Sequence, residues 1–396
     1  MKKKILFLGG AYSQIPAIQY AKDKGLYVIT ADYLPENPGH RISNEYYNIS
    51  TTDKDKILEL AQQLEINAIS AYASDPAALT AAFVSDKMIL VGGSYNAVKI
   101  LSDKTLFRKF LHDNNMHCPW FFSGTTLKDI LRDYNSGKAV LKPVDSSGSK
   151  GVTFIENRDD LKYKFDFAKS FSPTGKVILE QFIERKGPQI HGEGFVVNGK
   201  VIFLLLGDQI FSTVNDLAPY STTLPSYFHQ DVMSKIDNLI KEIIQKVGFK
   251  TGGINVEIIR DPNDNIYVLE IGARNGGNFM PQLEYYATGF NIAKANVDSL
   301  LGEPIAVNYQ IPVEKYFTQI ILHAKKAGHF KEINIPHELL PLLREKIIFI
   351  EKGQSVDIYK NSRDVIGVLI IESPDKNNYQ SIQQSLALND WVNLST

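Results

Sequence analysis

The stretch LKPVDSSGSKGVTFI, residues 141–155, places a turn rich in glycine and serine between two apolar runs. A phosphate group needs several converging N–H and O–H donors without bulky side chains, and glycine and serine provide them. The stretch is not a Walker A loop, because GxxxxGK[ST] is absent and the segment that follows has the pattern of a strand. We therefore expect a strand, a mobile flap over residues 145–151 and a second strand. A simple solvated hairpin is the alternative.

The composition of the whole chain is that of a soluble globular protein. Its 396 residues suffice for two or three domains, with 44% hydrophobic and 22% charged residues. A net charge of -1 gives no electrostatic argument for nucleic acid or membrane as a partner, and no apolar run reaches the roughly 18 residues of a membrane span. The single cysteine, Cys118, excludes an internal disulfide and predicts a cytoplasmic location.

Three regions differ in their patterns. Residues 1–101 alternate strand patterns (4–10, 26–32, 66–72, 88–93) with helix patterns (14–24, 54–64), which predicts an α/β domain with a parallel sheet. An amphipathic helix opening at Ser102 begins a second domain, residues 102–300, in which hairpins predict an α+β layer: 140–144 with 151–155, 195–206 and 254–271. Residues 301–396 contain further strand patterns (316–324, 346–353, 365–373) and form a smaller C-terminal α+β domain.

The hairpin over residues 254–271 contains two acidic residues that can face each other. If Asp261 faces Ile266 across the turn, Glu257 lies opposite Glu270, on the same side of the sheet. Like charges at directly opposite positions are unfavourable, so a cation between them is expected. Mg²⁺ binds a few carboxylates together with phosphate oxygens. The alternative is a one-residue slip in register that turns one glutamate to water.

Arg274 follows Glu270 in the glycine-rich segment EIGARNGG, residues 270–277. Arginine can hold a carboxylate or phosphate with two parallel hydrogen bonds. The alternative is an ordinary salt bridge to a nearby acid.

Taken in this order, these motifs resemble the ATP-grasp superfamily. The resemblance covers about residues 1–300 and is strongest to the branch of the carbamoyl phosphate synthetase large subunit, biotin carboxylase and formate-dependent glycinamide ribonucleotide transformylase, which also includes amino acid ligases. It implies a Rossmann-like pre-ATP-grasp domain, an ATP-grasp fold and a small C-terminal domain. The implied ligands are ATP and Mg²⁺ (or Mn²⁺), and relatives of this kind are commonly dimers.

The resemblance also implies roles for individual residues. Lys104 and Lys142 would contact the nucleotide phosphates, and the flap would close over them. Glu257 and Glu270 would bind metal, and Arg274 would steady an acyl phosphate or a substrate carboxylate. The remaining implied residues are those of the flap (Ser146, Ser147, Gly148, Ser149) and those of the adenine hinge (Glu180, Gln181, Phe182, Ile183).

Two positions depart from the family pattern. Gln189 stands where related ligases have a glutamate for the ribose hydroxyls, although its amide can still hydrogen-bond a diol. Gly272 replaces a metal-binding asparagine, for which Asn275 or Asn278 could compensate.

The resemblance implies an ATP-dependent carboxylate-amine (or thiol) ligase that forms an acyl phosphate and releases ADP and phosphate. Candidate substrate contacts are Asp75, His191, Glu193, Tyr220 and Ser221, each with a structural role as the alternative. One competing hypothesis is a purine-biosynthesis enzyme with a phosphoribosyl substrate, whose phosphate would bind at the turn GGAYSQ, residues 9–14. Another is a nucleotide-binding module without catalysis. An NAD enzyme is disfavoured because this turn lacks the third glycine of GxGxxG.

Overall fold

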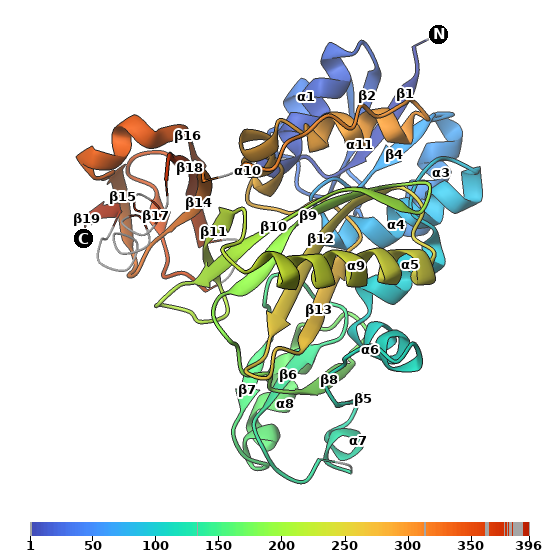
Figure 1. Cartoon of the computed structure of the whole chain (residues 1–396). Helices are drawn as coiled ribbons and strands as arrows, with labels where there is room; N and C mark the ends of the chain where they lie inside the picture. The colour runs from blue at the N-terminus through green and yellow to red at the C-terminus, as the bar shows by residue number, and fades with distance from the viewer. Residues whose placement is uncertain are drawn as a thin grey trace.

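The structure is a computed structural model that describes residues 2–132, 134–312, 314–360, 364–375, 377, 379, 382 and 391–395. Figure 1 shows the N-terminal segment as a helix-covered block at the top, a small lobe around β5 to β8 at the bottom and a C-terminal block on the left. Long strands of one large sheet run between these blocks. The predicted combination of α/β and α+β architecture is confirmed.

The N-terminal block is a four-stranded parallel sheet covered by helices. Its strand order is β3-β2-β1-β4, with β1 Lys4–Leu8, β2 Tyr27–Ala31, β3 Glu45–Tyr47 and β4 Ala68–Ser70. Its helices are η1 Tyr12–Gln14, α1 Ile15–Asp23, α2 Gly39–Ile42, α3 Lys54–Gln63, α4 Asp75–Met88 and α5 Tyr95–Ser102. Helices on both faces explain why β1 and β4 consist almost entirely of buried apolar residues. The turn after β1 and the segment from Tyr72 to Asp75 after β4 therefore lie at the same edge of the sheet.

Two details of this block differ from the sequence predictions. Residues 88–93 form a helix end and not a strand: Ile89 ends α4 in the left-handed conformation and the Leu90 N–H bonds back to the Ser85 carbonyl, as in a Schellman cap. Ile89 is 93% exposed, so its apolar character does not mark a buried strand. In addition, Ser102 is the last residue of α5, and the next helix is capped by Asp103.

The small lobe contains the predicted flap. It is a four-stranded sheet in the order β5-β8-β6-β7, reached through α6 Lys104–Asp113 and backed by α7 Leu127–Leu131 and α8 Asp160–Ser170. Its strands are β5 Phe121–Gly124, β6 Ala139–Pro143, β7 Thr153–Ile155 and β8 Val177–Gln181. Strands β6 and β7 pair antiparallel with Leu141 opposite Thr153, which confirms the strand, turn and strand expected over residues 141–155.

An eight-stranded antiparallel sheet forms the centre of the molecule. Its order is β13-β12-β9-β10-β11-β14-β18-β16. The strands are β9 Gln189–Val197, β10 Lys200–Phe211, β11 Pro219–Leu224, β12 Gly252–Arg260, β13 Ile266–Gly272, β14 Tyr316–His323, β16 Leu343–Ile348 and β18 Val365–Ser373. Helices α9 Gln230–Val247, α10 Met280–Thr288 and α11 Ile292–Leu300 pack around it. Both predicted hairpins, β9 with β10 and β12 with β13, are confirmed.

The C-terminal strands divide between two sheets. Strands β14, β18 and β16 continue the large sheet beyond β11, whereas β15 Gly328–Ile333, β17 Ser355–Val356 and β19 Val392–Ser395 form a separate sheet beside η2 His337–Leu342. The domain boundary expected after residue 300 stays a prediction. The first strand beyond it, β14, is hydrogen-bonded to β11 of the same large sheet. In the part of the chain that is described, no helix is both long and apolar enough to cross a bilayer.

Candidate active site

Glu257 and Glu270 face each other on the hairpin of β12 and β13. The predicted pairing is confirmed, but the predicted turn is wrong: Arg260, not Asp261, lies opposite Ile266. If the register that pairs Arg260 with Ile266 continued unchanged along the hairpin, Glu257 would lie opposite Leu269. A β-bulge at Leu269 adds one residue to β13 and brings Glu270 opposite Glu257.

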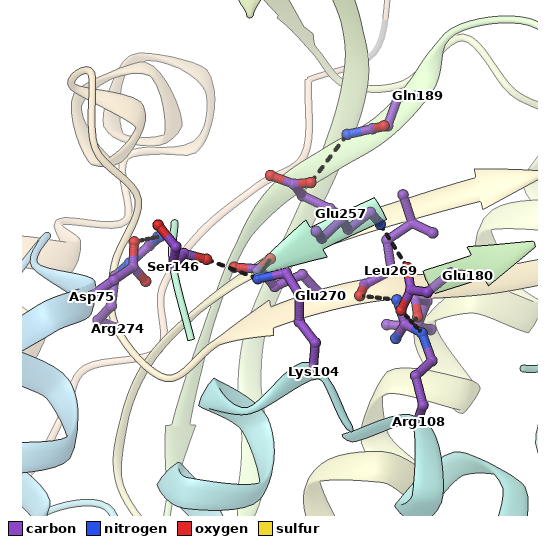
Figure 2. Close-up of polar contacts among 12 residues, drawn as sticks. Asp75, Lys104, Arg108, Ser146, Glu180, Gln189, Glu257, Leu269, Glu270 and Arg274 are labelled. Carbon is purple, nitrogen blue, oxygen red and sulfur yellow. Dashed lines mark hydrogen bonds and ion pairs between the residues drawn. The ribbon is translucent and has the colours of Figure 1, made fainter. Parts of the chain in front are cut away.

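The two carboxylates are like charges at directly opposite positions, which a bound cation would stabilise. Burial and then the negative charge of Glu270 raise the pKa of Glu257, while Gln189 Nε2 donates to Glu257 Oε2 at 3.4 Å. Lys104 Nζ lies 3.2 Å from Glu270 Oε2 (Figure 2). Among the described residues no three His, Cys, Asp or Glu side chains form a metal-binding group. A Mg²⁺ ion held by Glu257 and Glu270 would therefore complete its shell with phosphate oxygens and water, as Mg²⁺ commonly does.

Lys104 connects this pair to the flap. It is the first residue of α6, whose Asp103 cap accepts from the Leu106 N–H at 3.0 Å. Its Nζ donates to the Ser146 carbonyl oxygen at 2.9 Å. Burial alone would lower the pKa of Lys104, but the charges of Glu270, Glu180 and Asp75 raise it above its ordinary value. Lys104 is therefore a permanent positive charge beneath the flap.

The flap lies across the site in a tight conformation. Gly148 and Ser149 have φ of 66° and 58°, and Ser149 Oγ donates to the Leu217 carbonyl oxygen at 2.7 Å. Figure 2 shows Ser146 between Lys104 and Asp75. The predicted flap residues are thus placed beside the lysine that would bind phosphate.

Glu180, at the expected adenine hinge, has a fully buried carboxylate. Its Oε1 lies 2.8 Å from Arg108 Nε, and its Oε2 accepts from Lys142 Nζ at 2.7 Å. Burial opposes ionisation, but these two cations lower the pKa of Glu180 to about 2. The side chain is thus occupied by Arg108 and Lys142, and its contact with adenine stays a prediction. The backbone of Gln181 to Ile183 and the ring of Phe182, which is 36% exposed, follow directly along the chain.

Arg274 forms a two-pronged ion pair with Asp75 of the N-terminal block. Nε and Nη2 donate to the two carboxylate oxygens at 2.6 and 2.5 Å. This is the alternative considered for Arg274, a salt bridge to a nearby acid, and its contact with a substrate stays a prediction. A Cβ added at Gly272 would lie 3.1 Å from Arg274 Cζ, so this close approach explains why glycine stands at that position.

Compensation for Gly272 by Asn275 or Asn278 stays a prediction. The buried side chain of Asn275 lies over Gly253, where an added Cβ would meet it at 2.1 Å. The Asn278 carbonyl oxygen accepts from Gln319.

Gln189, the residue expected at the ribose, donates to Gln209 Oε1 at 3.1 Å as well as to Glu257.

His191 and Glu193 lie on the same face of the sheet as Glu257, because Glu257 pairs with His191 and Asn255 with Glu193. Burial lowers the pKa of His191 to about 4, so its ring is neutral at pH 7. Burial raises the pKa of Glu193 to about 7, although the Gly276 N–H at 2.7 Å and Asn255 at 2.8 Å donate to it.

Ser221 lies on the opposite face of the sheet, and Tyr220 contacts the C-terminal strands. Tyr220 packs edge-on against His323, and Ser221 alternates with Thr222, which is the residue of β11 that shares the face of Gln189.

The turn GGAYSQ is filled by its own glutamine. Gln14 Nε2 donates to the carbonyl oxygens of Leu8 and Tyr72, both at 2.9 Å, and the Ala11 N–H donates to Gln14 Oε1 at 3.0 Å. A Cβ at Gly9 would lie 2.3 Å from this Oε1. Two donors of this turn, the Ala11 N–H and the Gln14 amide, are therefore already used.

Sequence reasoning missed Arg108 and Gln14. Arg108 lies four residues after Lys104, on the buried side of α6 with Phe107 and Leu111. A charged residue among the apolar positions of an amphipathic helix was the available signal.

The family model of the ATP-grasp domain matches residues 136–282, which include the flap, the hinge and the facing glutamates. The chain contains an ATP-grasp domain. Among curated proteins, the chain is similar to the carbamoyl phosphate synthase large chain of Thermotoga petrophila (21% identical over 372 residues, 86% of this chain and 33% of that protein). It is also similar to the formate-dependent phosphoribosylglycinamide formyltransferase of Bordetella bronchiseptica (24% over 193 residues, 46% of each). The chain thus spans about a third of the length of the first curated relatives.

Solved structures of a ligase and a synthetase resemble the fold of the whole chain. An L-amino acid ligase from Bacillus licheniformis superposes with a TM-score of 0.82 at 18% identity, covering 100% of this chain and 98% of the ligase. A phosphoribosylglycinamide synthetase from Anaerococcus prevotii superposes with a TM-score of 0.77 at 19% identity, covering 100% of both chains. At this level of identity the likeness establishes the fold.

Proposed function

We propose that the protein is an ATP-dependent ligase that joins a carboxylate to an amine, or to a thiol, and releases ADP and phosphate. The single observation that supports this most is the facing pair Glu257 and Glu270 beneath a lysine-bound flap. A carboxylate oxygen would attack the γ-phosphorus of ATP, break its bond to ADP and form an acyl phosphate. The nucleophile would then attack the carbonyl carbon, lose one proton and displace inorganic phosphate.

Residues of the chain would distribute the charge of this reaction. Lys104 and Lys142 would bind phosphate oxygens, and Arg274 would exchange Asp75 for the acyl phosphate or the substrate carboxylate. Mg²⁺ at Glu257 and Glu270 would act as a Lewis acid on the phosphates. The flap over residues 145–151 would exclude water, which otherwise hydrolyses the acyl phosphate.

The filled GGAYSQ turn favours a ligase of small amines over an enzyme with a phosphoribosyl substrate. The Ala11 N–H and the Gln14 amide are already hydrogen-bonded within the block, so a substrate phosphate that used them would have to displace a buried side chain. The occupied turn supports amino acids or similar compounds as substrates.

The test is ADP and phosphate release by the full chain with ATP, Mg²⁺ and pools of amino acids, in parallel with phosphoribosylated amines. We expect Mg²⁺-dependent release only with the first set, and its loss in Glu270→Gln. Turnover restricted to phosphoribosyl substrates would support the alternative enzyme. Tight ATP binding without turnover in any pool would support a binding module.

A further inference from the structure

Arg108 is a fully buried cation to which the proposed reaction assigns no task. It lies on α6, one turn after Lys104, and its guanidinium contacts two different sheets. Nη2 and Nη1 donate to the carbonyl oxygens of Leu269 and Val268 at 2.8 and 3.4 Å, and Nε lies 2.8 Å from Glu180 Oε1 (Figure 2). Burial of a guanidinium is unfavourable unless such partners compensate for the lost water.

The first contact is made at the bulge that determines the site. Leu269 is the extra residue of β13. Without a bulge, the register that pairs Arg260 with Ile266 would place Leu269 opposite Glu257. A one-residue slip turns every side chain of a strand to the other face. Glu270 shares the face of Glu257 only because the bulge is present. The bulge carbonyl that Arg108 binds is thus next to the Glu270 backbone.

The second contact reaches the other end of the nucleotide site. Glu180 is buried and joins Arg108 to Lys142. The planar guanidinium of Arg108 donates to two carbonyl oxygens of β13 and forms an ion pair with Glu180, whereas the ammonium group of lysine is a single point charge with a different reach. One side chain therefore links the metal hairpin, the hinge strand and a phosphate lysine.

We propose that Arg108 is a positioning residue: it clamps the Leu269 bulge so that Glu270 stays opposite Glu257, and it orients Lys142 through Glu180. The inference rests on the proposed function. Arg108 acts through these groups and touches no reacting atom.

The experiment compares Arg108→Lys and Arg108→Met with Arg260→Met. Arg260 is the matched control, because it lies on the same hairpin, beyond the bulge, with its guanidinium 4.4 Å from the centre of the Phe228 ring. Mn²⁺ binding is measured on each protein saturated with a non-hydrolysable ATP analogue, which requires no turnover. The Mg²⁺ concentration for half-maximal ADP release is measured separately. We expect both Arg108 variants to need at least about 10-fold more metal than the wild type. Replacing a residue that orients metal ligands typically weakens metal binding by this factor or more. Arg260→Met should match the wild type.

Each outcome decides between the proposals. A folded Arg108 variant with the metal requirement of the wild type overturns the inference; a purely structural residue would lower kcat or the yield without moving that requirement. If Arg108→Met does not fold, the double variant Arg108→Met with Glu180→Gln removes both buried charges, and it should fold while still binding Mn²⁺ weakly. A wild type that binds neither Mn²⁺ nor nucleotide overturns the proposed function, and this inference with it.

Discussion

Glu257 shows how the candidate site departs from what folding alone would favour. It lies directly opposite another glutamate on a partly buried face, and burial together with that charge raises its pKa. Residues that bind ligands or metals often lower the stability of the free protein in this way.

Replacing Glu257 should therefore change stability and activity in opposite directions. We expect Glu257→Gln to stabilise the metal-free protein by up to about 1 kcal/mol, because an unfavourable pair of like charges is removed. ADP release should fall at least about 100-fold, equal to about 2.7 kcal/mol in the barrier. Urea unfolding and turnover assays check the two effects, with Glu242→Gln on the exposed side of α9 as control. Turnover that survives in Glu257→Gln would contradict the metal assignment.

Glu193 predicts a pH dependence of stability. Burial raises its pKa from 4.5 to about 7, so the folded chain keeps this proton while the unfolded chain loses it. The stabilising contribution is complete below pH 4.5 and is lost as pH rises towards 7, by about 3 kcal/mol in total. Glu193→Gln should remove this loss, so the free energy of unfolding of the variant relative to wild type should increase between pH 5 and 8. Unfolding at several pH values measures it, with Glu59→Gln on the surface of α3 as control. A difference that stays constant with pH would refute the assignment.

At the scale of elements, helix α6 depends on its cap. Asp103 accepts from the Leu106 N–H, and the next two polar contacts along this helix are those of Lys104 and Arg108. The cap thus supports both the helix and the position of two site residues.

Asp103→Ala should cost about 1 kcal/mol of stability through the lost cap. Asp53→Ala is a matched control, because Asp53 caps α3 through the Lys56 N–H at 3.2 Å, in the N-terminal block. Both variants should lose similar stability by urea unfolding, but only Asp103→Ala should raise the KM for ATP. Equal KM values in the two variants would show that the cap has no influence on the site.

At the scale of the whole molecule, the ion pair of Asp75 with Arg274 joins the N-terminal block to the central sheet. Both side chains are largely withdrawn from water, with 29% and 12% of their surfaces exposed. Breaking such a pair leaves one buried charge without its partner.

Asp75→Asn should therefore destabilise the protein by about 3 kcal/mol. Lys24→Met tests a second ion pair between the same two parts, in which Lys24 Nζ lies 2.9 Å from Asp298 and 2.7 Å from Glu303. Lys24 is more exposed than Arg274 (24% against 12%) and offers a single ammonium group, so this pair should contribute less than about 1 kcal/mol. Urea unfolding of the two variants measures the difference. A larger loss for Lys24→Met would contradict the importance of the buried pair.

Local patterns of the sequence were sufficient for several features. The Asn198-Gly199 turn and the hairpin around the flap both follow from neighbouring residues. They can be predicted because turn residues and alternation act over a few positions.

Other features were not accessible in this way. The strand expected at residues 88–93 is a helix end, since an apolar run does not reveal whether a sheet edge is available. The bulge at Leu269 was also missed, although it compensates for a turn that differs from the expected one.

The sequence by itself determined the ATP-grasp domain and the residue types of a candidate phosphate and metal site, because these depend on short motifs and their order. Only the tertiary structure decided which partners those residues have: Asp75 on Arg274, Arg108 at the bulge and on Glu180, and Gln14 inside its own turn. The reason is physical. A buried charge or amide must find a partner wherever packing places one, and for Asp75 and Arg274 that partner lies 199 positions away along the chain.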